Sequence, residues 1–267
     1  MKQILTIAGS DSGGGAGIQA DIKAIHANGG FGLSVITSIT AQNTKEVIRA
    51  FDVPIGIIEA QIDAVFSDFD VAALKTGMLS SPAIVQAVAK KLRRYSPINV
   101  VVDPVMLSKS QYPLLKPEAA DSLFSELMPL ATVVTPNVDE AQLLANCEIN
   151  TISDAKRAAK IISACGCGGV LVKGGHLAGK RASDVLLFDG VFTVFEADRI
   201  ETKNTHGTGC TYSAAIAAQL GHGKDLISAI GTAKDYITNA IRFSLDIGRG
   251  QGPTNHFYFL ERCNNSA

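Results

Sequence analysis

A glycine-rich turn at residues 204–211, with the sequence NTHGTGCT, runs directly into an alanine-rich segment. The first N–H groups of a helix have no partner within the helix, and the helix dipole favours negative charge at that end. The turn is therefore typical of a site for an anion such as a phosphate, although a plain loop-to-helix connection has the same composition. The candidate residues of this site are Gly207, Thr208, Gly209 and Cys210.

Cys210 is the most reactive side chain of this turn. A thiol at a helix N-terminus has a lowered pKa and can act as a base or a nucleophile. A single cysteine is more often buried and inert, so positioning a ligand is the alternative role. We predict that Cys210 contributes to catalysis more than to folding.

Polar and acidic side chains follow two of the apolar runs. Asp103 follows residues 98–102, and Asn137 and Glu140 follow residues 132–135. Ligands of open α/β sheets collect at the carboxyl ends of strands, where carboxylates can orient a hydrated Mg²⁺ between phosphates. Helix capping is the alternative interpretation of each of these side chains.

Two further glycine-rich segments carry weaker signals. Residues 9–17 (GSDSGGGAG) follow an apolar run, and their small residues let a ligand approach the backbone, but they do not fit the dinucleotide fingerprint GxGxxG. Residues 174–181 (GGHLAGKR) match a P-loop except that Arg181 replaces the required Ser or Thr, and they lead towards a hairpin and not a helix. These two departures exclude a P-loop NTPase.

The elements that must position these residues alternate along the chain. Short β-branched runs predict buried strands, and the segments between them have helical periodicity, with Ser81 as a cap and Pro82 at the first position of one helix. Such alternation predicts an α/β fold, in which helices cover a parallel sheet. The expected strands are residues 4–8, 33–40, 71–75, 98–102, 132–135 and 169–173.

The last third of the chain departs from this alternation. Residues 182–188 and 191–196 flank Asp189-Gly190 and predict a β-hairpin with a tight turn. Two helices should follow the hairpin. The first, at about 209–220, is alanine-rich and should be buried, and the second, at about 225–245, is more polar.

Composition narrows the class of protein. The chain has 267 residues, 46% of them hydrophobic, and a net charge of -1, without the broad cationic surface that nucleic acid requires. Lysines and arginines gather only at residues 90–94, which we interpret as the solvated end of a helix.

No apolar stretch is long enough for a signal peptide or a membrane span, and five cysteines without CxxC spacing fit reduced thiols in the cytoplasm. No linker divides the chain, so we expect one domain over residues 1–267, frayed at 263–267.

Several of these motifs occur together in one known family. Over nearly its full length, the chain resembles the hydroxymethylpyrimidine/phosphomethylpyrimidine kinases of thiamine biosynthesis, which belong to the ribokinase superfamily. The resemblance implies a three-layer α/β/α fold with a mostly parallel central sheet and a small β-hairpin near the nucleotide site. The shared segments, in the same order, are residues 6–11, 14–21, 35–37, 41–44, 75–79, 103–106, 173–176 and 204–211.

The resemblance also implies an activity and a set of site residues. Such an enzyme uses ATP and Mg²⁺ to phosphorylate 4-amino-5-hydroxymethyl-2-methylpyrimidine and then its monophosphate. Cys210 matches the position where sugar kinases of the superfamily usually carry Asp. Asn137 and Glu140 resemble the Asn-x-x-Glu metal-phosphate motif, with Asp103 as a further metal candidate. The positions that match pyrimidine contacts are Gly9, Ala16, Gln42 and Met78, and those that match phosphate or nucleotide contacts are Lys173, Thr208 and Lys234.

Alternatives remain open on the same fold. A pyridoxal or pyridoxine kinase also phosphorylates a hydroxymethyl group on a six-membered nitrogen heterocycle, and a lyase or a ligand-binding protein without catalysis is a second alternative. Residues 9–16 together with Gln42 favour the pyrimidine. One departure from the family is Gln111-Tyr112, where Gly-Asp is usual. Because the family commonly dimerises, we expect a homodimer.

Overall fold

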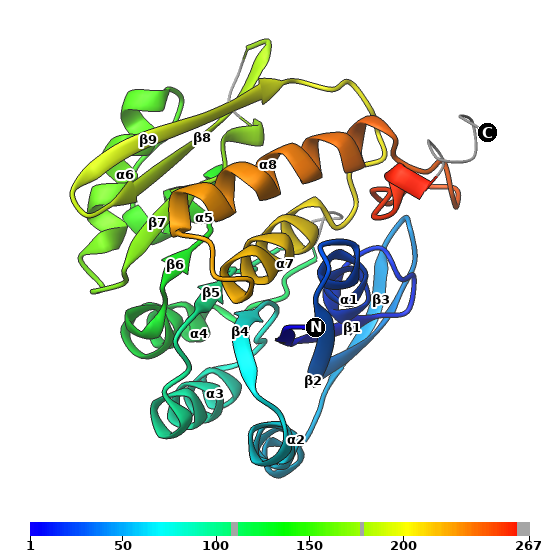
Figure 1. The fold of residues 1–267 in the computed structure, drawn as a ribbon, viewed down its shortest axis with the longest axis vertical. Coiled ribbons are helices and arrows are strands. Elements are labelled where there is room, and N and C mark those ends of the chain that lie inside the picture. The colour runs from blue at the N-terminus through cyan, green and yellow to red at the C-terminus, as the bar shows by residue number, and fades with distance from the viewer. Residues whose placement is uncertain (108–111, 177–178, 261–267) are drawn as a thin grey trace.

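A computed structural model describes residues 1–107, 112–176 and 179–260 of the chain. They form one nine-stranded sheet with the strand order β3-β2-β1-β4-β5-β6-β7-β8-β9 (Figure 1). Neighbouring strands from β2 to β7 are parallel, whereas the β2–β3, β7–β8 and β8–β9 pairs are antiparallel. The strands are β1 (Gln3–Asp11), β2 (Phe31–Gln42), β3 (Val47–Asp52), β4 (Val71–Thr76), β5 (Val100–Val102), β6 (Val133–Val134), β7 (Gly169–Val172), β8 (Arg181–Phe188) and β9 (Val191–Asp198).

Helices cover both faces of the sheet (Figure 1). One face carries α1 (Gly17–Ala27), α7 (Thr208–Gly221) and α8 (Leu226–Arg242). The other carries α2 (Ile55–Asp68), α3 (Pro82–Tyr95), α4 (Pro117–Ser122), α5 (Val138–Ala145) and α6 (Ile152–Ser163). Successive strand residues point to opposite faces, so Ile4 of β1 packs in the first core and Leu5 in the second. The three-layer arrangement that the resemblance implies is therefore confirmed.

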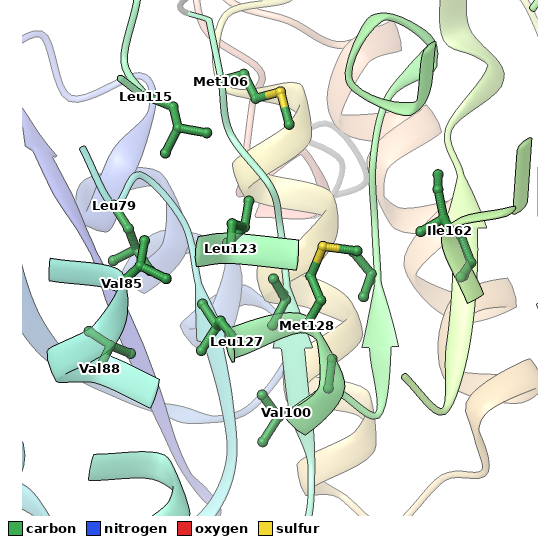
Figure 2. Packing of buried hydrophobic residues seen from close by; sticks show 14 of the residues in the cluster. Leu79, Val85, Val88, Val100, Met106, Leu115, Leu123, Leu127, Met128 and Ile162 are labelled. Atoms are coloured by element: carbon green, nitrogen blue, oxygen red, sulfur yellow. The ribbon is translucent and has the colours of Figure 1, made fainter. Parts of the chain in front are cut away.

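The core on the second face fixes the central strands. Figure 2 shows Val85 and Val88 of α3 on the same side as Leu123 and Leu127, around the strand that carries Val100. Full burial of each such side chain contributes about 1.5–3 kcal/mol, so the carboxyl ends of β4, β5 and β6 are held by a well-packed layer. The residues that follow these three ends form part of the site described below.

The six strands expected in the parallel sheet and the hairpin are all confirmed. Asp189 and Gly190 have φ angles of 48° and 76°, the left-handed conformation that a tight hairpin turn requires. The two C-terminal helices are also confirmed, and every residue of α7 from 211 to 221 is buried. β3 is the strand that the sequence did not predict, because it is an edge strand whose residues are mostly exposed or half-buried.

Two other expectations concern the chain surface and its end. The prediction that residues 90–94 form a solvated cluster is wrong for Lys91, which is buried and bonds Asp63 at 2.6 Å. The frayed end predicted at 263–267 lies outside the described residues. None of the helices within 1–107, 112–176 and 179–260 combines the length and the apolar character needed to cross a membrane.

Candidate active site

The turn that precedes α7 forms the centre of the site, and we call residues 205–210 the anion loop. Gly207 has a φ angle of 76°, and a Cβ at this position would overlap the carbonyl oxygen of Gly15. Only glycine therefore lets the anion loop lie against the turn between β1 and α1. No side chain caps α7, and within the described residues the N–H groups of Gly209 and Cys210 have no recorded acceptor. These groups lie where the sequence predicts an anion site.

Cys210 lies half-buried in the first turn of α7 and accepts a hydrogen bond from the N–H group of Gly17. Burial raises the pKa of the Cys210 thiol to about 11, Lys75 opposes the rise, and Asp21 adds to it. The predicted lowering of this pKa is wrong, because the loss of water around the thiol outweighs the nearby positive charge and the helix terminus. Cys210 is therefore a protonated thiol at neutral pH.

A fully buried ion pair lies beside Cys210. The ammonium group of Lys75 contacts both carboxylate oxygens of Asp21, at 2.9 and 2.8 Å, and neither side chain is exposed to water. Asp21 also accepts a hydrogen bond of 2.6 Å from the Thr6 hydroxyl. The negative charge of Asp21 raises the pKa of Lys75 above its ordinary value even though burial lowers it. Lys75 is therefore a permanent positive charge under the start of α7.

A second buried pair, Asp103–Lys173, lies on the other side of the helix start. Lys173 Nζ is 2.7 Å from Asp103 Oδ1, and the hydroxyl groups of Thr135 and Ser213 each donate to the same carboxylate at 3.1 Å. A Cβ built on Gly209 would lie 3.4 Å from Lys173 Nζ, which places this cation against the anion loop. Burial raises the pKa of Asp103, but Lys173 outweighs burial and holds it below its ordinary value.

Asn137 and Glu140 form the cap of α5. Asn137 Oδ1 accepts from the N–H of Glu140 at 2.8 Å, and Glu140 Oε2 accepts from the N–H of Asn137 at 2.8 Å. The capping interpretation is thus confirmed, and a metal role would be additional to it. Burial raises the pKa of Glu140 to about 7, although the charge of Lys173 lowers it. Glu140 therefore changes its charge close to neutral pH and lies within electrostatic reach of the Asp103–Lys173 pair.

Met78 and Gly9 form one wall on the side predicted for the pyrimidine. A Cβ on Gly9 would lie 2.9 Å from Met78 Sδ, so the backbone of β1 and the thioether are in direct contact. The Thr37 hydroxyl donates to the carbonyl oxygen of Met78 at 2.8 Å and fixes this segment after β4. Two of the predicted pyrimidine contacts are therefore neighbours in the structure.

Ala16 lies in the turn between β1 and α1, and Gln42 is bonded to Ser12 of the same turn. Gln42 ends β2 and lines a small hollow together with His206, Gln251 and residues 43–46. The N–H of Ala16 donates to Asp11 Oδ2 at 2.8 Å. Gly207 approaches Ala16 closely, because a Cβ on Gly207 would lie 3.2 Å from Ala16 Cα. The pyrimidine and phosphate sides of the predicted site therefore meet at Ala16 and Gly207.

Lys234 of α8 lies beside β8 and not at the anion loop. Its ammonium group bonds Asp184 of β8 at 2.7 Å, and both side chains are buried. The other oxygen of Asp184 accepts a hydrogen bond of 2.9 Å from the N–H group of Gly174. Gly174 lies in the turn that follows Lys173. A nucleotide contact of Lys234 stays a prediction, and the contact that the structure shows is a support for this turn.

Sequence reasoning missed several residues that hold the site together. Asp11 and His206 both occur in the glycine-rich segments of the sequence. The sequence does not show that they are in contact, yet His206 Nε2 lies 2.9 Å from Asp11 Oδ2. Lys75 and Asp21 were visible in the family motifs, and their burial as an ion pair needs the three-dimensional packing of α1 on the sheet. The departure at Gln111-Tyr112 falls largely outside the described residues, which resume at residue 112.

The carboxyl ends of the parallel strands thus carry unpaired helix N–H groups, two buried lysines and a small hollow lined by polar residues. This combination is typical of α/β enzymes that transfer a phosphoryl group.

Comparison with known proteins gives the family. Residues 11–255 match the model of the phosphomethylpyrimidine kinase family. The chain is 53% identical over 258 residues to a hydroxymethylpyrimidine/phosphomethylpyrimidine kinase of Rhizobium meliloti (strain 1021), covering 95% of this chain and 96% of the relative. The chain belongs to the hydroxymethylpyrimidine/phosphomethylpyrimidine kinase family, which makes it a kinase of thiamine biosynthesis.

Two solved structures agree with this assignment and confirm the ribokinase-like fold. An ADP complex of Bacillus subtilis pyridoxal kinase matches with a TM-score of 0.91 and 40% identity, over 97% of this chain and 99% of that one. A phosphomethylpyrimidine kinase from Clostridium difficile 630 matches with a TM-score of 0.80 and 46% identity, over 90% of this chain and 100% of that one. The fold is therefore shared by kinases of two different heterocycles.

Proposed function

We propose that this chain, acting as one domain over residues 1–267, transfers the terminal phosphoryl group of ATP to the hydroxymethyl group of 4-amino-5-hydroxymethyl-2-methylpyrimidine. It then phosphorylates the monophosphate to give the pyrimidine diphosphate. The observation that carries the proposal is the position of the anion loop, whose free N–H groups lie beside Lys173 and whose Gly207 packs against Gly15 and Ala16 in the turn that follows β1. A phosphoryl group bound there is adjacent to both the cations and the heterocycle.

The residues of the anion loop and Lys173 supply the electrostatic part of catalysis. Phosphoryl transfer has a loose transition state, so positioning and charge stabilisation matter more than covalent chemistry. The N–H groups of Gly209 and Cys210 hold the phosphoryl oxygens, and Lys173 neutralises the charge of those oxygens. Lys173 Nζ is close enough to do so, because it lies 3.4 Å from the position that a Cβ of Gly209 would take. These donors are fixed before the substrate binds.

Cys210 orients the acceptor hydroxyl in this proposal. With a pKa of about 11, the thiol is protonated at neutral pH, so it is a poor general base there. Its place at the start of α7 lets it lie against the hydroxymethyl group. The role is positioning, which is the alternative that the sequence left open.

The donor set around Glu140 fits a magnesium ion. Mg²⁺ prefers carboxylate oxygens and usually keeps several waters, binding through one or two carboxylates together with phosphates. Within the described ranges, no group of three His, Cys, Asp or Glu side chains could hold a metal by itself. The carboxylates of Glu140 and Asp103 both already accept hydrogen bonds, so they would hold the ion through its bound waters, and Asp103 also fixes Lys173. The bound ion would neutralise charge on the transferring phosphates.

A substrate panel tests the function. The purified enzyme is incubated with Mg²⁺ and ATP and with hydroxymethylpyrimidine, its monophosphate, pyridoxine or ribose, and both ADP and the phosphorylated product are measured. We expect the first two compounds to be phosphorylated with the highest kcat/KM. Pyridoxine is the second candidate, because the ADP complex of a pyridoxal kinase has the same fold with a TM-score of 0.91. A higher kcat/KM for pyridoxine than for both pyrimidines would contradict the proposal.

The β8–β9 hairpin borders the nucleotide in this proposal. Asp184 of β8 bonds both Lys234 and the N–H of Gly174, so the hairpin supports the turn that follows Lys173. Hydrogen exchange with and without ADP tests this placement. We expect ADP to slow exchange in residues 183–196, and an unchanged rate there and in the neighbouring turn contradicts it.

A homodimer is the assembly that we propose. Two-fold dimers are the commonest closed assemblies of soluble proteins. Ile39 and Phe51, which are paired across β2 and β3, are 54% and 66% exposed and are apolar enough to belong to an interface. Light scattering at micromolar concentration tests the assembly, and the mass of a single chain would rule it out.

A further inference from the structure

Cys165 and Cys167 lie in the short turn between α6 and β7, with Gly166 between them. The N–H of Gly166 donates to the carbonyl oxygen of Ser163 at 3.0 Å and closes the end of α6. Gly166 has a φ angle of 91°, in the left-handed region that favours glycine. The glycine therefore bends the chain between the two cysteines.

The two thiol groups are in contact with each other. The Cys167 thiol donates a hydrogen bond to the sulfur of Cys165, and the backbone N–H of Cys167 donates to the same sulfur. These donors lower the pKa of the Cys165 thiol to about 7, although burial raises it. The pKa of the Cys167 thiol is raised, because its hydrogen is held by Cys165 and because the group is partly buried. Cys165 is therefore the thiolate of the pair, and Cys167 keeps its proton.

Both side chains are accessible from solvent. Each is half-buried, and the glycines on either side of Cys167, Gly166 and Gly168, are exposed. Cys167 also lines a second hollow, of about 270 Å³, together with Ser163 and residues 187–190 of the β8–β9 hairpin. A small molecule can therefore approach the pair from this hollow.

The spacing of the two cysteines suits a bond between their sulfurs. Residues two positions apart have Cα atoms at most about 7.6 Å apart, and a bend shortens this distance into the range of about 4.4–6.8 Å that a disulfide spans. Within residues 1–107, 112–176 and 179–260, no group of three His, Cys, Asp or Glu side chains could hold a metal ion. The pair thus lacks the further ligands that a structural zinc ion requires.

We propose that Cys165 and Cys167 form a thiol–disulfide exchange site for small disulfides such as glutathione disulfide, separate from the kinase site. The Cys165 thiolate attacks one sulfur of the small disulfide, forms a mixed disulfide and releases one thiolate. The Cys167 sulfur then bonds to the Cys165 sulfur, the bond between Cys165 and the small molecule breaks, and the second leaving thiolate takes the proton of Cys167. The pair is oxidised by two electrons, and the small disulfide is reduced.

The kinase site lies at the other end of the strand that follows the pair. Cys167 precedes β7, whereas Lys173 directly follows it. Cys210 should react more slowly with the same disulfide, because burial raises the pKa of its thiol to about 11 and exchange requires a thiolate. Oxidation of the enzyme should therefore occur first at Cys165 and leave the anion loop unchanged.

Peptide mass spectrometry tests the proposal. The reduced enzyme is incubated with glutathione disulfide, alkylated to stop exchange and digested with trypsin. Cleavage after Lys160 and Lys173 releases residues 161–173, which contain Cys165, Cys167 and no other cysteine. We expect this peptide without alkylation and about 2 Da lighter than its reduced form, because two hydrogens are lost. The kcat of the oxidised enzyme should stay within about twofold of the reduced enzyme, because the two sites are distant.

Three variants separate the two steps of the exchange. In Cys167→Ser the hydroxyl can still donate to Cys165 but forms no disulfide, so glutathione should remain on Cys165. Cys165→Ser should lower the rate of modification of residues 161–173 about three- to tenfold, because the remaining thiol is mostly protonated. Cys147→Ser is the matched control, because Cys147 is also half-buried but follows α5. This variant should form the disulfide at the wild-type rate.

The wild-type result decides the pairing even if a variant does not fold. The pairing is overturned if residues 161–173 stay reduced, if glutathione remains on wild-type Cys165 without closure, or if Cys147 or Cys210 is modified first. Equal rates for Cys165→Ser and the wild type would overturn the assignment of Cys165 as the attacking thiolate. A kcat that falls as the disulfide closes and recovers with dithiothreitol would contradict the separation of the two sites.

Discussion

The phosphate side and the pyrimidine side of this site are built on different principles. On the phosphate side, backbone N–H groups at the start of α7 lie beside two buried lysines, each paired with an aspartate at 2.7–2.9 Å. On the pyrimidine side, a neutral amide and a thioether, Gln42 and Met78, form the contacts that we propose for the ring. Fixed charge serves the transferred group, whereas neutral groups of fixed direction distinguish one heterocycle from another.

This difference fits a fold that serves kinases of different heterocycles. The chain has 40% identity to a pyridoxal kinase with a TM-score of 0.91, so most of the backbone is common to both activities. Charge stabilisation of a phosphoryl group does not depend on the ring that carries the hydroxyl. Substitutions on the phosphate side should therefore lower kcat for every acceptor, and those on the pyrimidine side should change the relative kcat/KM of acceptors.

Removal of Lys173 is expected to have the largest effect. Lys173→Gln removes the cation beside the anion loop and leaves Asp103, which is 2% exposed, without its charge partner. Loss of one electrostatic contact to the transition state typically lowers kcat about 10²–10³-fold. We expect this decrease with hydroxymethylpyrimidine and with its monophosphate alike, measured as steady-state ADP release.

A second buried lysine provides the control for Lys173→Gln. Lys91 is also buried and pairs with Asp63 at 2.6 Å, but it lies on α3, away from the anion loop. Lys91→Gln should lower the free energy of unfolding and keep kcat. Equal decreases in kcat for both variants would mean that Lys173 acts through stability, and the electrostatic assignment would be withdrawn.

Cys210→Ala is expected to have the next largest effect. General-base catalysis contributes about 10²–10⁴-fold, and a thiol that only positions the hydroxyl should contribute no more than the lower end, about 10²-fold. With its pKa raised to about 11, the Cys210 thiol should add no inflection to the pH profile of kcat between pH 6 and 9. A thiol inflection in that range that disappears in Cys210→Ser would show that the thiolate is the base.

Cys210 also marks how far the sequence can predict such a site. The glycine-rich turn before an alanine-rich helix predicts the anion loop, because a helix start depends on local sequence. The pKa of Cys210 depends on how much water reaches the thiol and on charges contributed by Lys75 and Asp21, which come from other elements. Local sequence therefore predicted the start of α7 correctly and predicted the wrong direction of the pKa shift of Cys210.

For the fold, too, local sequence predicts some features, whereas others depend on residues that are distant in the chain. Buried parallel strands such as β4 are continuous apolar runs that the sequence reveals directly. β3 is an edge strand paired only with β2, and its exposed Ile48 and Phe51 give no pattern of burial from which to predict it. The bond between Asp11 and His206, residues 195 positions apart, likewise required the fold to be known.

Protonation of His256 at acid pH should weaken the contact between the C-terminal residues and α7, the helix that follows the anion loop. This ring bonds the Thr211 hydroxyl of α7 at 3.0 Å, and burial lowers the pKa of His256 to about 4. Because the unfolded chain binds this proton at about pH 6.5, stability is full above that pH and falls as pH decreases towards 4. We expect protonation of His256 to contribute a loss of about 2 kcal/mol in the free energy of unfolding between pH 7 and pH 5, whereas Glu140, whose pKa burial raises to about 7, contributes in the opposite direction.

Urea unfolding at the two pH values measures this loss. His256→Gln removes the titrating ring, so its change in stability from pH 7 to pH 5 should be more favourable than that of the wild type by about 2 kcal/mol, whereas the exposed His222→Gln should follow the wild type. If His256→Gln unfolds with the same dependence on pH as the wild type, another group binds the proton and His256 is not the acid-sensitive support of α7.

The smallest effect is expected from adding one methyl group on the pyrimidine side. In Gly9→Ala, the new Cβ would lie 2.9 Å from Met78 Sδ, closer than side chains tolerate, so the flexible methionine must move. A displaced Met78 narrows the space for the heterocycle, and KM for hydroxymethylpyrimidine should rise about three- to tenfold while kcat changes less. Gly56→Ala is the matched control, since a Cβ there meets no atom within 4 Å and should leave the kinetics unchanged. If Gly9→Ala instead lowered kcat for all acceptors with KM unchanged, the methyl group would be disturbing the anion loop through the turn after β1, and the two sides of the site could not be varied independently.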